Sequence, residues 1–491
     1  MDSAGQTIAL ALLLPTVGAV LIACARRQPN LRETITGITS VALFACVLTL
    51  LPTVLGGARP ELSLFTVMPG LQLAFKVEPL GMLFAVVASG LWIVNSLYSV
   101  GYMRGNDETH QTRFYVCFAL ALAATMGIAF AANLFTLFVF YELLTLVTYP
   151  LVTHHGTPEA RRGGRTYLGV LLGSSIVLLL PALVCVWYVA GTTDFVPGGI
   201  LRGKLGHAAL AGLLALCVFG IAKAALMPVH RWLPAAMVAP TPVSALLHAV
   251  AVVKAGVFSV VKVVLYIFGV DNLANAGITG AADWLVPMAG FTIVAASVVA
   301  LAADNLKRRL AYSTVSQLSY VLMAAALLAP LSLVGAILHI AAHAVGKITL
   351  FFAAGAVYTA AHKTDVSQLD GIGRRMPWTM GAFAIASLSM IGLPPAVGFV
   401  SKWYMLSGAM AQQHWLAVGV IVLSTLLNAA YFLPIVYRAF FVAHAEVKGG
   451  AMHGEAPLPM VLALSLTATI TVILFFWPDV PLALARQAIT S

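Results

Sequence analysis

The stretch from Phe219 to His248, FGIAKAALMPVHRWLPAAMVAPTPVSALLH, decides how the chain is interpreted. It is apolar enough to lie in a membrane, yet it carries Lys223 and the prolines Pro228 and Pro234. Proline removes a backbone donor and clashes with the preceding turn, so we expect a discontinuous helix here. Freed carbonyls at membrane depth are tolerated only where they are buried in protein or line a water-filled cavity.

A second stretch repeats this pattern near the C-terminal end of the chain. Residues 389–406, SMIGLPPAVGFVSKWYML, place Pro394 and Pro395 close to Lys402. Comparable breaks in the two halves of a transporter point to inverted repeats and to the translocation site. We therefore expect two five-helix repeats, 114–268 and 281–443.

The composition agrees with a membrane protein. The 491 residues include only 27 Lys and Arg and 17 Asp and Glu, which is 9% charged, while 61% are hydrophobic. These values exclude a soluble globule of this size, a disordered chain and a basic nucleic-acid-binding face. Fourteen apolar runs predict an all-α polytopic membrane protein of about 14 transmembrane helices, and the runs lie at about 7–25, 34–55, 79–101, 114–131, 133–152, 166–190, 207–238, 241–268, 281–302, 310–328, 331–360, 377–410, 414–443 and 457–477.

The regions outside the two repeats are assigned from the same pattern. Residues 1–113 would hold the first three helices, the first of which we interpret as a retained helix because no cleavage site precedes Arg26. The alternation in 56–77 around a Pro-Gly predicts a small extramembrane hairpin. Residues 444–491 would hold helix fourteen and a tail.

The distribution of cations predicts the topology. One side of the membrane would carry 17 Lys and Arg and the other 5, out of 27. Under the positive-inside rule this places both termini outside a cell (inner) membrane. The five remaining cations fall within apolar runs, and they are Lys223, Lys254, Lys262, Lys347 and Lys402.

Other ionisable residues also lie deep in apolar runs. They are Glu142, His248, His339 and His343. Burying such groups in lipid costs several kcal/mol or more, so we expect them to face a protein interior or a water-filled cavity. In HIAAHAVGK, His339, His343 and Lys347 recur every four residues, about 6 Å apart on one helical face, a spacing that suits bridging waters. Imidazole can donate and accept near neutrality, so this inventory is typical of a proton path.

No sequence feature indicates a catalytic centre, a cofactor or a metal. The five cysteines lie in apolar runs without a CxxC, and there is no HExxH. An intramembrane enzyme or electron carrier is therefore disfavoured. Enzymatic activity would belong only to a larger redox complex that contained this chain.

Several motifs resemble one family. They are YELLTLVTYPL around Glu142, AKAALMPVHRWLPAAMVAPTPVSALLHA around Lys223, VVKAG around Lys254, DNLKRRLAYSTVSQL at 304–318, HIAAHAVGKITLFF and GLPPAVGFVSK. In this order they resemble the antiporter-like subunits shared by respiratory complex I, Mrp-type cation/proton antiporters and membrane-bound hydrogenases.

The resemblance implies a fourteen-helix core with two inverted repeats, each holding a half-channel, joined by a polar axis. It also implies partner membrane subunits, contact with lipid, and protons with or without Na⁺ as the transported ions, but no nucleic acid. Lys254 within VVKAG and a lysine at 402 look most like the D-type subunit of Mrp antiporters, or the complex I chain nearest the peripheral arm. By the motif match, Glu142, Lys223, Lys254, His339, His343, Lys347 and Lys402 are expected to be the path residues.

These assignments predict a mechanism. Glu142 would pair reversibly with Lys223 and so change its proton affinity. The proton would then pass through Lys254, the His339 and His343 row and Lys347, and leave near Lys402. An interhelical hydrogen bond by a protonated Glu142 is the competing interpretation.

Some roles and functions stay open. His248 could belong to the relay or merely bond across helices, His230 could be a surface residue, and Lys262 is expected to snorkel to the interface, with Glu78 as an interfacial anchor. The alternatives to an Mrp-type subunit are a proton-pumping subunit of a complex I-like NADH:quinone oxidoreductase or of a membrane-bound hydrogenase. A stand-alone transporter of an organic solute would need a pocket at the helix breaks. Which complex holds the chain, whether Na⁺ crosses it, the direction of proton release and the energy source stay undetermined by the sequence.

Overall fold

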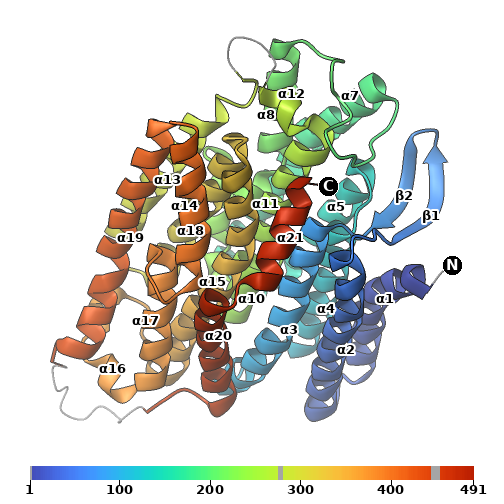
Figure 1. Cartoon of the computed structure of the whole chain (residues 1–491). Coiled ribbons are helices and arrows are strands. Elements are labelled where there is room, and N and C mark those ends of the chain that lie inside the picture. The colour runs from blue at the N-terminus through green and yellow to red at the C-terminus, as the bar shows by residue number, and fades with distance from the viewer. Residues whose placement is uncertain (1–2, 275–279, 444–453, 491) are drawn as a thin grey trace.

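The computed structural model describes residues 3–274, 280–443 and 454–490, and over these the chain is a helical bundle with one β-hairpin (Figure 1). The first half contains α1 Ser3–Cys24, α2 Pro29–Leu55, β1 Glu61–Met68, β2 Leu71–Lys76, α3 Pro79–Gly105, α4 Gln111–Ala129, α5 Leu134–Val152, α6 Pro158–Ser174, α7 Leu180–Ala190, α8 His207–Gly220, α9 Trp232–Ala235, α10 Thr241–Ala245 and α11 Val252–Val263. The second half contains α12 Val270–Ala274, α13 Leu285–Ala302, α14 Leu306–Ala326, α15 Pro330–Ala361, α16 Ile372–Arg375, α17 Pro377–Ile391, α18 Val397–Ala411, α19 Trp415–Phe441, α20 Leu458–Phe476 and α21 Asp479–Thr490.

The prediction of an all-α polytopic membrane protein is confirmed. Within the described ranges, eleven helices are long and apolar enough to cross a membrane, and two shorter apolar helices are α8 and α17. Every predicted apolar run falls on helical segments. The number of fourteen crossings and the repeat symmetry stay predictions. Residues 444–453, which begin the predicted last segment, lie outside the described residues.

Two helical segments form the centre of the bundle. The most apolar windows of Thr241–Phe268 and Pro330–Ala361 are fully buried inside the protein, whereas those of most other spans are half-buried or less. A helix that is apolar all round is typical of a buried position. These central segments carry Lys254, His339, His343 and Lys347, so the surrounding helices separate these side chains from lipid.

The structure contains the predicted hairpin, whose extramembrane position stays a prediction. Strands β1 and β2 pair antiparallel around Pro69 and Gly70, and the hairpin extends away from the bundle near the N-terminus (Figure 1). Three apolar side chains of β1, those of Leu64, Phe65 and Val67, are more than half exposed.

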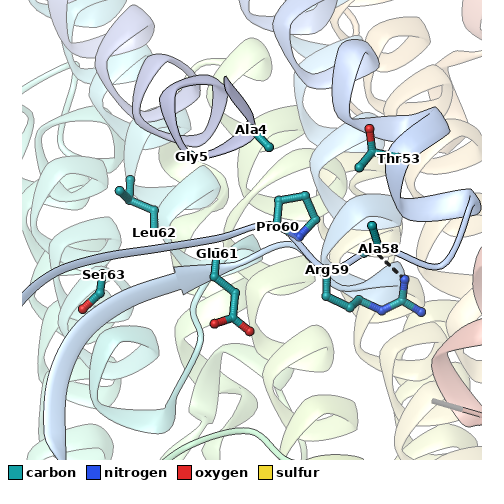
Figure 2. Close-up of a pocket in the computed structure, with 9 residues that line it drawn as sticks. All are labelled: Ala4, Gly5, Thr53, Ala58, Arg59, Pro60, Glu61, Leu62 and Ser63. Atoms are coloured by element: carbon teal, nitrogen blue, oxygen red, sulfur yellow. Dashed lines mark hydrogen bonds between the residues drawn. The ribbon is translucent and has the colours of Figure 1, made fainter. Parts of the chain in front are cut away.

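A cavity of about 670 Å³ lies at the base of this hairpin (Figure 2). Arg59 and Glu61 are the charged residues that line it. The Arg59 guanidinium donates to the carbonyl of Ala58 over 3.0 Å. None of the predicted path residues lines this cavity, so it is separate from the ionisable row.

The helix containing Lys223 is discontinuous, as predicted. Helix α8 ends at Gly220, a short 3₁₀ turn covers Ala222–Ala224, and Pro228 precedes a second 3₁₀ turn at Val229–Arg231. Pro234 lies within the same interrupted stretch between α8 and α10, which holds the four-residue α9 between two 3₁₀ turns. It lies in the first turn of α9, where a backbone N–H has no intrahelical acceptor and proline is tolerated.

The second interruption lies between α17 and α18. Helix α17 ends at Ile391, Gly392 adopts a left-handed conformation, and α18 begins at Val397. Pro394 and Pro395 lie in the gap, as predicted.

A π-helical turn, not predicted from the sequence, joins α10 to α11. It covers Leu246–Val250 and contains His248. A second π turn, Val264–Phe268, begins two residues after Lys262. Such turns are frequent at functional sites, so His248 and Lys262 are candidate functional residues.

Candidate functional site

Lys223 lies in the first helix break, where free backbone groups and hydroxyls surround it. Its Nζ donates to the carbonyl of Tyr141 over 2.8 Å and to the hydroxyl of Thr145 over 2.5 Å. It also lies 3.2 Å from the centroid of the Tyr141 ring. The side chain is fully buried. Among the described residues, helix α5 therefore supplies both hydrogen-bond acceptors of this ammonium group.

Glu142 lies next to Tyr141 on α5 but does not contact Lys223. Among the described residues no ion pair within 4.0 Å involves Glu142, and both of its carboxyl oxygens are buried without a hydrogen-bond partner. The predicted ion pair is therefore absent from this conformation. A buried carboxyl group without hydrogen-bond partners is energetically costly.

Lys254 on α11 contacts His343 on α15 directly. Lys254 Nζ lies 2.6 Å from His343 Nδ1, and neither residue exposes more than 1% of its surface. The contact joins the two central segments. The sequence did not predict this pair, because the two residues are far apart in the chain.

His339 lies one turn from His343, and their ring centroids are 5.9 Å apart. Its Nδ1 lies 2.9 Å from Ser401 Oγ and its Nε2 lies 3.0 Å from Gln317 Oε1. Ser401 belongs to α18 and Gln317 to α14. His339 therefore connects the central helix α15 to the second helix break.

Lys402 lies in α18, next to Ser401 in the sequence, and its ammonium group reaches that break. Its Nζ donates to the carbonyls of Met390 and Ile391 over 2.8 Å and 3.1 Å. The amide of Gln317 donates to the same Met390 carbonyl over 3.2 Å. The second break thus holds its lysine through free carbonyls at the end of α17.

Lys347 and His248 form a separate cluster. Lys347 Nζ donates to Ser313 Oγ over 2.9 Å and to the carbonyl of Leu310 over 3.2 Å. That carbonyl also accepts from Thr314 Oγ1, and His248 Nδ1 lies 3.0 Å from the same hydroxyl. His248 therefore belongs to the polar interior, through a hydroxyl that the sequence did not identify.

These contacts change the expected order of the relay. The sequence predicted that Lys347 would lie between the histidines and Lys402. Instead, Lys402 directly follows Ser401, which contacts His339. Lys347 lies two turns from His339 along α15 and belongs to the cluster that also contains His248. His339, His343 and Lys347 follow one another along α15 as predicted. Lys402, however, lies at the His339 end of this row and not at the Lys347 end.

Lys262 and Glu78 differ from their predicted roles. Lys262 is fully buried, not snorkelling, and its Nζ lies 3.3 Å from Glu78 Oε1 and donates to the carbonyl of Ala131 over 2.6 Å. Glu78 is also buried, so it is not an interfacial anchor. Burial raises the pKa of the Glu78 carboxyl, and the nearby cations Lys262, Lys76 and Arg59 oppose that shift. A carboxylate and an ammonium group compensate each other here, which removes the need to reach water.

His230 stays near the first break but outside the central row. It is half-buried, and its ring lies 6.3 Å from that of Tyr312. Within the described part of the chain, its Nδ1 is buried without a partner.

The residues that the sequence analysis missed are neutral. Gln317, Ser401, Thr314 and Thr145 connect ionisable groups, but each is also common in ordinary helix packing. The sequence feature that could have identified these four residues is their position on a polar stripe inside an otherwise apolar run. No group of three or more His, Cys, Asp or Glu that could hold a metal occurs among the described residues.

Comparisons with known proteins agree with this architecture. A family model described as "NADH:quinone oxidoreductase/Mrp antiporter, TM" matches residues 131–428. The N-type subunit of the NADH-quinone oxidoreductase of Desulforudis audaxviator is 33% identical over 386 residues, which cover 78% of this chain and 75% of that protein. The D-type subunit of the Na(+)/H(+) antiporter of Alkalihalophilus pseudofirmus is 26% identical over 466 residues, 94% of this chain and 92% of that one.

A solved structure shows the same fold. A chain in the Mrp complex from Dietzia sp. DQ12-45-1b superposes with a TM-score of 0.85 at 22% identity, covering 100% of this chain and 97% of that one. The family match spans both helix breaks and the whole row from Glu142 to Lys402. The chain therefore belongs to the family of antiporter-like membrane subunits that NADH:quinone oxidoreductases and Mrp antiporters share.

Proposed function

We propose that this chain moves protons through the membrane as one subunit of a larger complex, along the row from Lys223 to Lys402. The observation that carries the proposal is the set of contacts from Lys254 through His343 and His339 to the second break. A row of titratable side chains, fully buried at the centre of an apolar bundle, has a high desolvation cost that packing alone does not require.

The charges of the row support a proton as the moving species. Lys254, His343, His339 and Lys402 are all bases, and none forms an ion pair with a carboxylate among the described residues. Several adjacent bases cannot all be protonated in a low-dielectric interior. A proton added at one end therefore favours loss of a proton at the other.

Glu142 is the proposed loading group of the first break. It follows Tyr141, which coordinates Lys223, so a small movement of α5 would bring the carboxyl group toward the ammonium group. Pair formation would stabilise a proton on Lys223, and pair separation would release it toward Lys254. The unpaired arrangement of Glu142 corresponds to the second state.

The membrane orientation is part of the proposal. The excess of cations on one set of connectors supports a cell (inner) membrane with both termini outside. The exposed apolar side chains of the hairpin are suited to contact with a partner subunit, because patches of this kind mark interaction sites.

The two repeats, 114–268 and 281–443, are also proposed. The fourth transmembrane unit of each would be the discontinuous one, and each break holds a lysine through backbone carbonyls, Lys223 on Tyr141 and Lys402 on Met390. Their equivalent positions support half-channels related by inversion.

The proposal is tested on vesicles that contain the whole complex. Lys223→Met, His343→Gln and Lys402→Met should each reduce proton transport by at least tenfold while the complex assembles normally. Lys204→Met, which removes an exposed lysine outside the row, is the matched control. Full transport in both the Lys223 and the His343 variants would refute the proposal.

The ion and the energy source distinguish two versions of this function. The Na(+)/H(+) antiporter relative, which aligns over almost the whole chain, favours Mrp-type exchange of a monovalent cation for a proton. The NADH-quinone oxidoreductase relative favours a quinone-reducing pump. Purifying the complex from its source and identifying its subunits separates them. An Mrp-type complex should exchange Na⁺ for protons without an electron donor, whereas a pump should move protons only during quinone reduction.

A further inference from the structure

A cavity of about 270 Å³ lies at the cation-rich end of the bundle, where distant parts of the chain meet. Tyr102 and Glu108 line it from α3 and the connector that follows, and His155 lines it from the connector between α5 and α6. Thr241 and Lys307 contribute from α10 and α14. The cavity therefore lies where the two proposed repeats adjoin.

An acid and a histidine face each other in this cavity. Glu108 Oε1 lies 3.2 Å from His155 Nε2, and His155 Nδ1 lies 3.3 Å from the carbonyl of Val238. Only 11% of the Glu108 side chain is exposed, against 38% for His155. The pair is thus in contact with solvent on one side and with the protein interior on the other.

The surroundings of His155 favour its protonated form. The hydrogen bond that the His155 ring donates to the Glu108 carboxylate raises the pKa of His155, and burial and Lys307 oppose the shift. Burial lowers the pKa of the adjacent His154 to about 4, although its Nε2 is only 3.7 Å from Glu108. The other charged neighbours are Arg113, which donates to the His154 carbonyl, and Lys363 on the cavity wall.

Hydroxyl groups extend from this cavity toward the membrane interior. Tyr102 lines the same cavity as Glu108, and its hydroxyl shares a hydrogen bond with Thr241. Thr241 begins α10, and the π turn that follows contains His248. Phe351, whose ring centroid lies 4.7 Å from that of His248, is one turn from the cavity-lining Ala354.

A glycine keeps this region closely packed. A Cβ added at Gly355 on α15 would lie 2.2 Å from the Tyr98 hydroxyl and 2.7 Å from Thr241 Cγ2. The central helix therefore approaches Thr241 more closely than any larger residue would allow. This close approach places the cavity directly against the central segments.

We propose that this cavity is the proton uptake site of the chain, with Glu108 and His155 as the first acceptors and Tyr102 and Thr241 as the connection to His248. The proposal rests on the proposed proton path and adds where protons are taken up. It also gives His248 a function, because Thr314 joins His248 to the Lys347 cluster.

Each transfer in this sequence conserves the proton. Hydronium in the cavity loses a proton to the Glu108 and His155 pair and becomes water. The pair then breaks one N–H or O–H bond as the Tyr102 hydroxyl accepts that proton and passes its own to Thr241. The Thr241 hydroxyl relays in the same way. His248 lies seven residues further along the chain, so water completes the transfer, each molecule gaining one O–H bond and losing another, and an N–H bond forms at His248 Nε2, which is buried without a partner among the described residues.

The test measures the pH dependence of proton transport by the whole complex in vesicles. Glu108→Gln removes the anion that stabilises a proton on His155, so the alkaline limb of the profile should move by about one pH unit toward acid. At the pH where the wild-type rate is half-maximal on that limb, this shift corresponds to a loss of about fivefold. At acid pH the rate should stay within twofold, and Glu108→Asp should restore most of the shift.

Thr241→Val and two control variants complete the test. Thr241→Val should lower the rate several-fold at every pH without moving the alkaline limb, because it removes a relay hydroxyl and no titrating group. Glu159→Gln and His362→Asn change exposed residues at the same end of the bundle, outside the cavity, and should behave as the wild type.

An unshifted profile for Glu108→Gln, or a loss of equal size at every pH, would overturn the uptake proposal. The His343→Gln variant, measured in the same vesicles, separates this result from failure of the proposed function. If His343→Gln abolishes transport while Glu108→Gln leaves the profile unchanged, the proton path stands and only the uptake site is wrong. If His343→Gln has full activity, the proposed path itself fails.

Discussion

Lys254 on α11 and His343 on α15 share a hydrogen bond of 2.6 Å between Nζ and Nδ1, in the fully buried centre of the bundle. A hydrogen bond requires one donor and one acceptor, so an ammonium group can face a neutral imidazole here but not an imidazolium ion. Two adjacent cations would repel each other strongly in this environment. The pair therefore holds at most one excess proton, because only one of the two residues can be charged at a time.

This relationship predicts how the two residues behave together. Lys254→Met and His343→Gln should each reduce proton transport by at least tenfold, since relay groups typically contribute factors of about 10² or more. Because the residues act as a unit, the double variant should transport no more slowly than the worse single variant. The measurement is the initial rate of vesicle acidification, with Lys204→Met as the control. Losses that multiply in the double variant would show that the two residues act independently.

Gln317 is predicted to matter as a bridge although it carries no charge. Gln317→Leu removes contacts to His339, Asn428 and the Met390 carbonyl, and so disconnects His339 from part of the second break. Transport should fall several-fold. Thr349→Val is a suitable control, because it removes a buried hydroxyl of α15 that bonds to Thr467 away from the row.

Both substitutions leave buried polar groups without a hydrogen-bond partner, so each should lower the free energy of unfolding by about 1–3 kcal/mol. Only the Gln317 variant should lose transport. If both variants lose transport in proportion to the fall in melting temperature, the role of Gln317 is structural.

The sequence predicted the row on α15 because a four-residue spacing is a property of one helix. His339, His343 and Lys347 therefore lie as expected. Contacts between helices were not predictable in the same way. The position of Lys402 beside His339, and not beside Lys347, depends on how α18 packs on α15, and no local pattern records that packing.

The lysines of α11 illustrate the same limit. Lys262 lies toward the end of an apolar run, where snorkelling is the ordinary expectation. Its partner Glu78 precedes a different helix, and the contact depends on the tertiary fold. Both helix breaks were predictable from proline, and Pro234 lies in the first turn of the short helix α9 inside the first break, a position that proline tolerates.

Removing one partner of the buried Lys262 and Glu78 pair should destabilise the protein far more than removing both partners together. Lys262→Met leaves an uncompensated carboxylate among buried groups and should destabilise the protein by about 3–5 kcal/mol. Glu78→Leu with Lys262→Met removes both charges, so the double variant should recover to within about 1 kcal/mol of the wild type. Thermal unfolding of the purified complex provides the comparison.

The surface pair of Lys76 and Glu61 is the control for this experiment. Its side chains are 29% and 61% exposed, so Lys76→Met should cost no more than about 1 kcal/mol. A double variant at Glu78 and Lys262 that is as unstable as the single variant would mean that the pair contributes more than charge compensation.

The lowered pKa of His154 predicts that part of the stability of the protein is lost at acid pH. Burial lowers its pKa from 6.5 to about 4 in the folded protein. Between these values the unfolded chain binds more protons than the folded one, so this contribution to stability decreases as the pH falls through that window. His154→Phe, which retains an aromatic ring against Phe114, should weaken the loss of melting temperature between pH 6.5 and 4.

The contribution of His155 to stability should have the opposite pH dependence. Its folded pKa is raised by Glu108, so its contribution is present at low pH and is lost as the pH rises through that raised pKa. His155→Gln should therefore reduce the melting temperature below pH 6.5 and have little effect well above the raised pKa. Identical pH dependence in the His154 and His155 variants would contradict both assignments.

Gly256 holds the first helix break against the central helix. A Cβ at this position would lie 2.2 Å from the backbone nitrogen of Ala224 and 2.3 Å from the carbonyl carbon of Lys223, and backbone atoms cannot move aside as a flexible side chain can. Gly256→Ala should therefore displace the turn that positions Lys223, and reduce transport by at least tenfold. Gly212→Ala on α8 meets nothing within 4 Å and should stabilise its helix by about 1 kcal/mol with normal transport. Because both variants add one methyl group to a helical glycine, normal transport in Gly256→Ala would show that the position of Lys223 tolerates movement, and the proposed loading site would need a different residue.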